Sequence, residues 1–371
     1  MSFPDLIRAG QVFDGRSDAP LRDHVIEMSG GRVTALRPAQ PGDPAAMADI
    51  AAPGFIDMQI NGAADVQFNF DPTPEALARI AAGARQGGTA HLLPTFITAP
   101  GRDYLRALTA ARQAMAQGVP GVLGVHLAGP FRSPRRPGIH DPAAIRPLDE
   151  TDLSALTEAF PGVLLLTLAP EEQPAGAIAR LSEAGVVVFA GHSEAHCDQV
   201  AGLRGATHLW NAMSQLTGRA PGLVGAVLDG DLYAGIIADG HHVAWENIRL
   251  AARVMPERLC LVTDAMLTLA GTIREFSLHG VTIRLAEGRL TDPEGTLAGA
   301  HLAMDRAVAN MVALGRVGLA AALRMASGNV ARALGVADLG WIGAGARASV
   351  TLLGQDLAAR GVVVDGQLFE V

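Results

Sequence analysis

The chain has 371 residues, of which 49% are hydrophobic and 18% are charged, enough to bury a sizeable core. Its formal net charge of −8 and its 4% of aromatic residues exclude a basic nucleic-acid footprint and a stacking surface for single strands. All 29 basic residues are arginines, which excludes Schiff-base chemistry, a phosphate-binding loop lysine and a carbamylated lysine that bridges two metal ions.

The two ends of the chain carry short alternating patterns that are typical of exposed strands. Residues 5–52 are broken by turn residues, and residues 344–371 look similar, with a strong hairpin signal at Asp365-Gly366. Neither end is long enough to bury a core alone. We therefore predict one small β-sandwich domain formed from both termini, with residues 1–52 and 340–371 contributing to it.

The middle of the chain, residues 53–339, repeats a different pattern. Eight nearly continuous apolar runs alternate with helix-like segments, as in strands that are buried on both faces of a parallel sheet. This succession predicts an α/β fold, a (β/α)₈ TIM barrel. The predicted strands cover 54–61, 90–98, 121–128, 163–169, 186–192, 206–211, 232–238 and 259–264.

The first predicted helix has clear start and stop signals. Thr73 is placed to cap it, Pro74 occupies its first position, and Gly87-Gly88 ends it. Its apolar stripe consists of Leu77, Ile80 and Ala84. Further helical stripes are predicted over 104–115, 153–160, 177–184 and 248–254.

Polar residues gather at the ends of the predicted strands, where barrel enzymes carry their active residues. They are Gln59, Asn61, His126, His192, His208 and Asp264. One such histidine alone is more often a hydrogen-bonded core residue than a ligand. Polar residues at the ends of several strands together favour a functional site that these residues share.

Within that site, three side chains predict metal-assisted hydrolysis. His192 and His208 lie on adjacent strands and could direct two imidazoles at one divalent ion, such as zinc or iron. Asp264 is placed to act as a general base. Arg219, in a loop rich in glycine and proline, is either a phosphate ligand or a solvated loop arginine.

The two cysteines, Cys197 and Cys260, are too few for a disulfide framework or a Cys-rich zinc site. The first 30 residues lack a basic start followed by a long apolar run, and no apolar stretch reaches the length of a membrane span. We expect a cytoplasmic protein with no membrane partner.

Nine motifs follow one another over nearly the whole chain. They are PGFIDMQING (53–62), HLAGPF (126–131), RPGIHD (136–141), AGHSEA (190–195), THLWNAM (207–213), GRAPGLVGA (218–226), GIIADGHHV (235–243), LVTDA (261–265) and TLAGAHLAM (296–304). In this order they resemble the N-acetylglucosamine-6-phosphate deacetylases of the amidohydrolase superfamily. The resemblance implies hydrolysis of N-acetylglucosamine 6-phosphate to glucosamine 6-phosphate and acetate, one divalent metal ion, and a homodimer.

The resemblance also implies roles for residues of the reaction centre. His192 and His208 match the two histidine ligands of the metal, Asp264 matches the catalytic aspartate, and His140 matches the histidine that polarises the acetyl carbonyl. The wider superfamily carries His-x-His on the first strand, whereas this chain has Gln59-x-Asn61. Both ligand positions of a second metal have become amides, which leaves one metal site at most.

Other positions match contacts to the substrate. His242 and Arg219 match the phosphate ligands, and in relatives the arginine can come from the partner subunit, so that Arg219 would reach the neighbouring site. A loop that lines the sugar corresponds to Leu297, Ala298 and Gly299. The remaining matched contacts are Ile139, Asn211 and Ala212.

One departure from the family pattern affects the metal site. The family has His-Leu-Glu-Gly-Pro after the third strand, and its glutamate is the third metal ligand, whereas this chain has Ala128. A catalytic zinc usually keeps three protein ligands, so two histidines should bind an ion more weakly. We consider an inactivating Glu→Ala change, a natural variant whose metal is held by His126 or Asp264, and a metal-free relative that only binds the sugar phosphate. An amidohydrolase for another N-acyl amino sugar phosphate is a further alternative.

Overall fold

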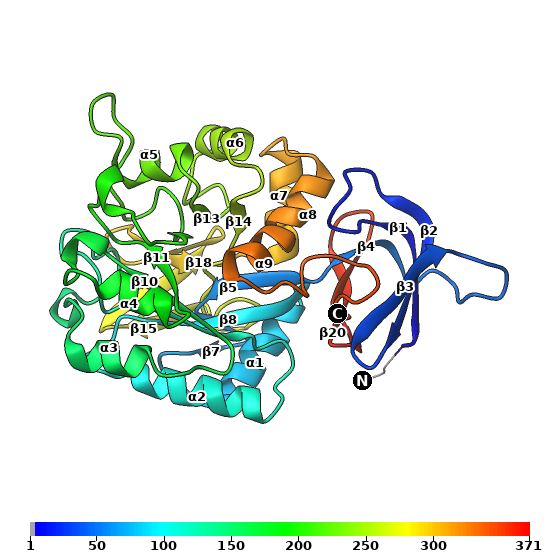
Figure 1. Ribbon diagram of the computed structural model, residues 1–371, viewed down its shortest axis with the longest axis horizontal. Helices are drawn as coiled ribbons and strands as arrows, with labels where there is room; N and C mark the ends of the chain where they lie inside the picture. Colours follow the sequence, from blue (N-terminus) through cyan, green and yellow to red (C-terminus); the bar gives the residue numbers. More distant parts are fainter. Residues whose placement is uncertain (1–3) are drawn as a thin grey trace.

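The computed structural model describes residues 4–371 and is built around an eight-stranded parallel sheet with helices on its outside (Figure 1). Its strands are β5 (Phe55–Ile60), β8 (Thr89–Ile97), β9 (Gly124–Ala128), β10 (Val163–Leu168), β11 (Val187–Ala190), β12 (Gly205–Ala206), β13 (Tyr233–Ile236) and β14 (Leu259–Leu261). Each strand pairs with the next one along the chain. A parallel bridge between Ile60 and Ala265 closes the sheet, which confirms the predicted barrel.

Several barrel strands are shorter than the sequence predicts, and three of them end before a residue with a left-handed backbone. β11, β12 and β14 end just before His192, His208 and Asp264, whose φ angles are 49°, 34° and 49°. A left-handed backbone leaves the extended conformation that a strand requires. The predicted strand over 206–211 is therefore wrong beyond Ala206. His192, His208 and Asp264 thus lie after the strands, whereas Gln59 and His126 lie within β5 and β9.

Helices connect the strands along most of the barrel. They are α1 (Pro74–Arg85), α2 (Tyr104–Ala116), α3 (Glu150–Leu156), α4 (Ala177–Glu183), α5 (Gly222–Asp229), α6 (Trp245–Val254), α7 (Met304–Ala313), α8 (Leu319–Met325) and α9 (Gly328–Leu334), with single turns at η1 (Pro142–Ala144), η2 (Pro170–Glu172) and η3 (Cys197–Gln199). The predicted start of α1 is confirmed, since the Thr73 side chain accepts a hydrogen bond from the backbone N–H of Ala76. The helix predicted over 153–160 begins earlier, because Asp149 and Asp152 form a capping box at its start.

The two termini form one small β-unit beside the barrel, as predicted (Figure 1). Its strands, in sheet order, are β21 (Gln367–Glu370), β20 (Ala359–Val364), β19 (Val350–Leu353), β4 (Ala48–Pro53), β1 (Leu6–Val12), β2 (Leu21–Ser29) and β3 (Arg32–Pro38). These strands belong to one sheet, which curls so that Arg32 forms an antiparallel bridge with Arg347. Ile7, Ile26 and Val363 are among the buried residues of its own core.

A four-stranded antiparallel sheet after β14 was not predicted. It consists of β15 (Glu275–Leu278), β16 (Val281–Ala286), β17 (Arg289–Thr291) and β18 (Leu297–Ala300), and a short pair, β6 (Gly62–Ala63) and β7 (Val66–Gln67), follows β5. The expected sugar-lining loop at 297–299 is thus a strand. A bridge between Ala300 and Ala265 attaches this strand to the carboxyl end of the barrel.

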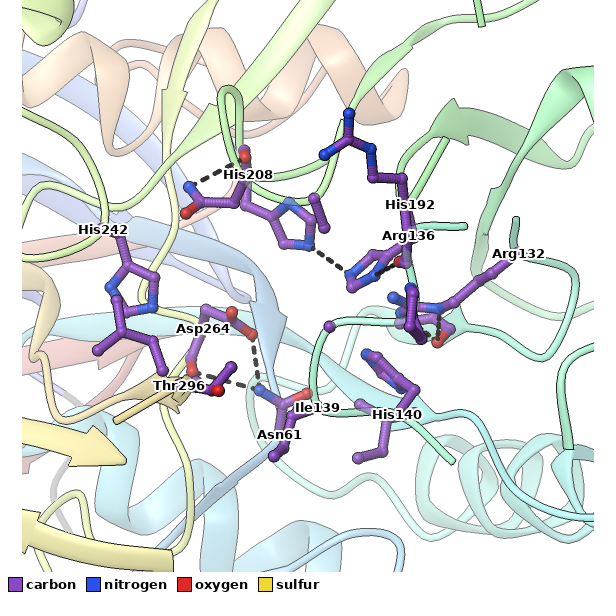
Figure 2. Close-up of a pocket in the computed structure, with 18 of the residues that line it drawn as sticks. Asn61, Arg132, Arg136, Ile139, His140, His192, His208, His242, Asp264 and Thr296 are labelled. Atoms are coloured by element: carbon purple, nitrogen blue, oxygen red, sulfur yellow. Dashed lines mark hydrogen bonds between the residues drawn. The ribbon is translucent and has the colours of Figure 1, made fainter. Parts of the chain in front are cut away.

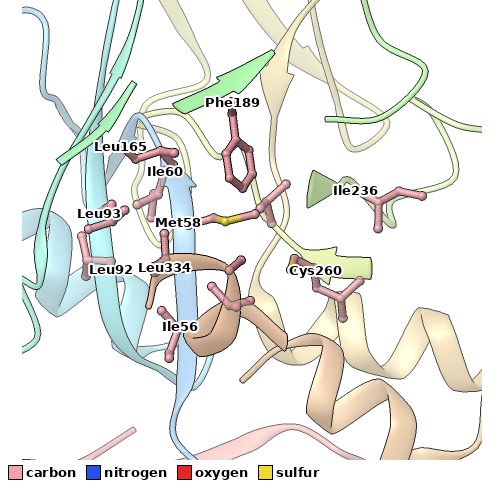
Figure 3. Close-up of a cluster of buried hydrophobic side chains, with 14 of the residues drawn as sticks. Ile56, Met58, Ile60, Leu92, Leu93, Leu165, Phe189, Ile236, Cys260 and Leu334 are labelled. Carbon is pink, nitrogen blue, oxygen red and sulfur yellow. The ribbon is translucent and has the colours of Figure 1, made fainter. Parts of the chain in front are cut away.

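Apolar side chains fill the interior of the barrel. Met58, Ile60, Leu165 and Phe189 gather there, each with no more than 2% of its surface exposed (Figure 3). Because this core is packed, a ligand can enter only where the loops open at the carboxyl ends of the strands. Within residues 4–371, no helix combines the length and the apolar character that crossing a membrane requires.

Candidate active site

A cavity of about 560 Å³ opens at the carboxyl ends of the barrel strands (Figure 2). The structure brings most of the predicted site residues into its wall: Gln59, Asn61, Ala128, Ile139, His140, His192, His208, Asn211, Ala212, His242, Asp264, Leu297 and Gly299. Residues from distant parts of the chain therefore share one pocket.

His192 and His208 face each other in this cavity. Their Nε2 atoms are 3.1 Å apart, and His192 Nδ1 lies 2.9 Å from the carbonyl oxygen of Arg136 (Figure 2). Burial lowers the pKa of His208 to about 4 and holds the pKa of His192 well below its usual value. Both imidazoles are therefore neutral at pH 7. Two ligands of a tetrahedral zinc ion are separated by about 3.3 Å, so this pair has the spacing of two metal ligands.

Ala128, at the position where a third ligand is expected, and Arg132 line the cavity together with the two histidines. The Ala128 side chain offers no donor atom. Arg132, only 2% exposed, donates from Nε to the Ala128 carbonyl oxygen over 2.8 Å, and its Nη2 donates to the same oxygen. Its Nη1 has no hydrogen-bond partner. Burial lowers the pKa of Arg132 to about 9, against the opposing effect of Asp264, so the guanidinium is charged at pH 7.

The residues present do not complete a site for a divalent ion. Among residues 4–371, no three or more His, Cys, Asp or Glu side chains are grouped so that they could hold a metal. The His192–His208 pair supplies two nitrogens, and Ala128 supplies nothing. The charged Arg132 in the same wall opposes a second cation.

His126, considered above as an alternative metal ligand, does not line the cavity. Its Nδ1 lies 3.2 Å from Thr95 Oγ1 and its Nε2 lies 2.7 Å from Thr167 Oγ1, inside the barrel and away from the cavity wall. Both ring nitrogens are thus used by hydroxyl groups. This histidine is the hydrogen-bonded core residue that a single strand-end histidine more often is.

Asp264 is the only carboxylate among the residues that line the cavity. Its Oδ1 accepts a hydrogen bond of 2.7 Å from Asn61 Nδ2 (Figure 2), while Asn61 Oδ1 and Gln59 Oε1 are buried without partners. Asn61 thus orients Asp264, and the two amides leave acceptors unused at the base of the site. Beneath them Asp57 is fully buried, which raises the pKa of its carboxyl to about 7.

His140 and His242 stand on different sides of the cavity (Figure 2). The buried His140 ring meets His192 edge to face with centroids 4.8 Å apart, and its Nδ1 has no partner. His242 Nδ1 lies 2.7 Å from Asp239 Oδ2, and the backbone N–H groups of His241 and His242 donate to the other oxygen of this carboxylate. The His242 ring is therefore fixed with Nε2 available for a ligand.

Two predicted residues lie outside the cavity wall. Ala298 packs with Ile97 and Met266 in a small apolar cluster, because alternate residues of β18 face opposite sides and only Leu297 and Gly299 face the pocket. Arg219 is exposed on the loop that precedes α5. Arg219 is not among the residues that line the cavity.

Sequence reasoning missed the arginines of the segment after β9. Arg132, Arg135 and Arg136 line the cavity, and Arg136 forms an ion pair with Glu194. The rule that places active residues after barrel strands could have found Arg132, which follows β9 by four residues.

Comparisons with known proteins identify the family of the chain. The Amidohydrolase family matches residues 50–369. The chain is 35% identical to N-acetylglucosamine-6-phosphate deacetylase of Haemophilus influenzae, covering 85% of each chain, and 36% identical to N-acetylgalactosamine-6-phosphate deacetylase of Escherichia coli O157:H7, covering 94% of this chain and 95% of that one. The crystal structure of N-acetylglucosamine-6-phosphate deacetylase from Pasteurella multocida superposes with a TM-score of 0.94 at 33% identity, over 99% of this chain and all of that one. The chain belongs to the amidohydrolase family.

Proposed function

We propose that the chain hydrolyses the acetamide of N-acetylglucosamine 6-phosphate, releasing glucosamine 6-phosphate and acetate. The observation that carries the proposal is the single cavity in which Asp264, His140 and His242 meet the His192–His208 pair. The relatives with this activity in their names support the substrate.

Asp264 is the general base in this proposal. Asn61 fixes its carboxylate, which takes a proton from the attacking water and returns it to the departing amine nitrogen. His140, neutral and with an unpartnered ring nitrogen, contacts the acetyl carbonyl. Enzymes of the amidohydrolase family generally use a divalent metal ion, but the residues present here do not complete its site, so we assign no step to one.

The phosphate group is bound at the other side of the cavity. His242, fixed by Asp239, donates from Nε2 to a phosphate oxygen. We propose that the chain forms a homodimer in which Arg219 of the partner subunit completes this contact, because the loop that carries Arg219 is exposed and separate from its own cavity. Binding of the remote phosphate then places the amide against Asp264.

A second candidate substrate is N-acetylgalactosamine 6-phosphate. The relative from Escherichia coli O157:H7 that is named for this activity aligns over 94% of the chain. The two sugars differ in the configuration of one hydroxyl group and present the same acetamide and phosphate. The same catalytic residues would therefore act on either sugar.

The purified chain tests the proposal with both sugar phosphates and unphosphorylated N-acetylglucosamine. We expect acetate release from a phosphorylated sugar with a higher kcat/KM than from the unphosphorylated one. Asp264→Asn should lower kcat by about 10²–10⁴-fold and leave sugar-phosphate binding intact, because the variant loses only the general base. Sugar-phosphate binding by the wild-type chain without acetate release would instead identify a binding protein, and full turnover by Asp264→Asn would exclude this mechanism.

A further inference from the structure

A buried positive charge lies in the wall of the reaction cavity. Arg132 is 2% exposed, yet it lines the cavity together with His140, His192 and His208. Its guanidinium points toward these rings, and Asp264 approaches the cavity from another side (Figure 2). Since the three imidazoles are neutral, the buried positive charge in their wall is that of Arg132, whereas Arg135 is exposed and Arg136 pairs with Glu194.

The guanidinium is held in one position by its own loop. Nε and Nη2 both donate to the carbonyl oxygen of Ala128. A side chain at Gly129 would collide with this arrangement, because a Cβ atom there would lie 3.1 Å from Arg132 Nε and 2.1 Å from Thr98 Oγ1. The glycine at 129 thus leaves room for Thr98 and for the arginine.

One nitrogen of this clamped group makes no hydrogen bond. Arg132 Nη1 is buried and finds no hydrogen-bond partner among residues 4–371. A buried donor without a partner is costly, more so when it carries charge, so such groups in a native pocket usually meet an acceptor on the ligand. An oxygen that is negative or becomes negative fits best, because a charge-assisted hydrogen bond is about twice as strong as a neutral one.

We propose that Arg132 is a catalytic residue: its Nη1 donates to the acyl oxygen of the substrate and supplies, in place of a divalent ion, the positive charge that stabilises the oxyanion. This proposal rests on the hydrolysis proposed above. The water oxygen bonds to the acyl carbon while Asp264 takes one water proton. The electron pair of the oxyanion then re-forms the C=O bond, the C–N bond breaks with its electron pair on the nitrogen, and Asp264 returns the proton there. The remaining proton of the water passes from the resulting acetic acid to the amine, so the products are acetate, whose carboxylate remains against Arg132, and the protonated amine.

The first test replaces the guanidinium and keeps a polar side chain. Arg132→Gln should lower kcat by about 10²–10³-fold with a KM for the sugar phosphate within a few-fold of the wild-type value, as expected when a donor to an oxyanion is lost. Arg132→Ala should regain activity when guanidinium is added, which a structural role would not allow. Arg85→Gln is the matched control, because Arg85 is also buried but lies on α1, outside the cavity wall. Equal kcat of the wild type and Arg132→Gln would overturn the proposal while the hydrolase function stands.

The second test measures binding and does not require turnover. Acetate should bind the wild-type chain in a calorimetric titration, and Arg132→Gln should weaken this binding at least tenfold. If the wild type releases no acetate from sugar phosphates, the function proposed above fails, and this titration still decides whether Arg132 binds a carboxylate. Acetate binding that is absent, or unchanged by the substitution, would overturn the proposal.

The third test asks whether the guanidinium occupies the position of a cation. A glutamate introduced by Ala128→Glu would meet Arg132, so zinc affinity should rise little, whereas Ala128→Glu combined with Arg132→Leu should bind zinc at least tenfold more tightly than either single variant. Equal zinc affinity of Ala128→Glu and the double variant would contradict the proposal. Loss of wild-type activity on chelation, with recovery on addition of zinc, would contradict it as well.

Discussion

His242 shows how one residue can separate substrate binding from chemistry. Asp239 accepts from the ring and from two backbone N–H groups, so the imidazole is fixed at the rim of the cavity without help from the substrate. We predict that His242→Ala raises KM for the phosphorylated sugar about 10–100-fold, as expected for loss of a hydrogen bond to a charged group. Hydrolysis of unphosphorylated N-acetylglucosamine should be unchanged, because it lacks the group that His242 binds. Steady-state kinetics with both sugars measures this difference, and an equal loss for the two substrates would place His242 in the chemistry instead.

For single residues, the sequence predicted which side chains follow the barrel strands, but it did not predict which groups those side chains contact. Asp264, His192 and His208 could be predicted because strands in a parallel barrel end at one face. The sequence could not show that Arg132 folds back on the carbonyl of Ala128, since this contact depends on the path of a loop. It also placed His126 with the other strand-end histidines, although hydroxyl groups of two neighbouring strands enclose its ring.

Among the helices and strands, α1 begins at a capping residue, Thr73, that the sequence alone was sufficient to predict. The Thr73 hydroxyl accepts the Ala76 N–H over 3.2 Å, and this residue begins the helix that packs beneath β8. Thr73→Ala should lower the free energy of unfolding by about 1 kcal/mol, measured by urea denaturation, because one backbone donor loses its partner. Thr109→Ala is the control, since the Thr109 hydroxyl binds a backbone carbonyl in the middle of α2 and caps no helix. Thr73→Ser should retain the wild-type stability, and a loss as large as that of Thr73→Ala would show that the cap is not the cause.

The burial and composition of each strand explain which strands could be predicted. β10 has a nearly continuous apolar run, and β8 is buried along its whole length although it contains His91 and Pro94; both were located to within one residue. β15 and β16 are largely exposed and have mixed composition, so their pattern did not differ from that of a loop. The early ends of β11, β12 and β14 depend on positive φ angles at non-glycine residues, which a hydropathy pattern does not record.

For the whole molecule, the important junction is the one between the barrel and the β-unit of the two termini. Ala90, at the start of β8, packs against Val362 and Val364 of β20. The next residue, His91, is fully buried, and within the described part of the chain neither of its ring nitrogens has a hydrogen-bond partner. It lines a separate cavity of about 330 Å³ together with Arg347 and Asp365. The pairing of the termini was predictable from their length and alternation, whereas this buried imidazole between two units was not.

Burial, with a smaller contribution from Arg347, lowers the pKa of His91 to about 3, whereas an unfolded histidine titrates near 6.5. Between these values the unfolded chain binds a proton that the folded chain does not, so the stability is complete above pH 6.5 and is lost as the pH falls toward 3. At pH 5 the loss from this one group is about 2 kcal/mol relative to pH 8. We predict that His91→Leu, which puts an apolar side chain of similar size in place of the imidazole, reduces the fall in unfolding free energy between pH 8 and pH 5 by about 2 kcal/mol. Urea denaturation at both pH values measures this free energy, and His196→Leu, at an exposed histidine, is the control for loss of an imidazole. An equal fall in the wild type and His91→Leu would show that the acid sensitivity of the molecule arises elsewhere than at this junction.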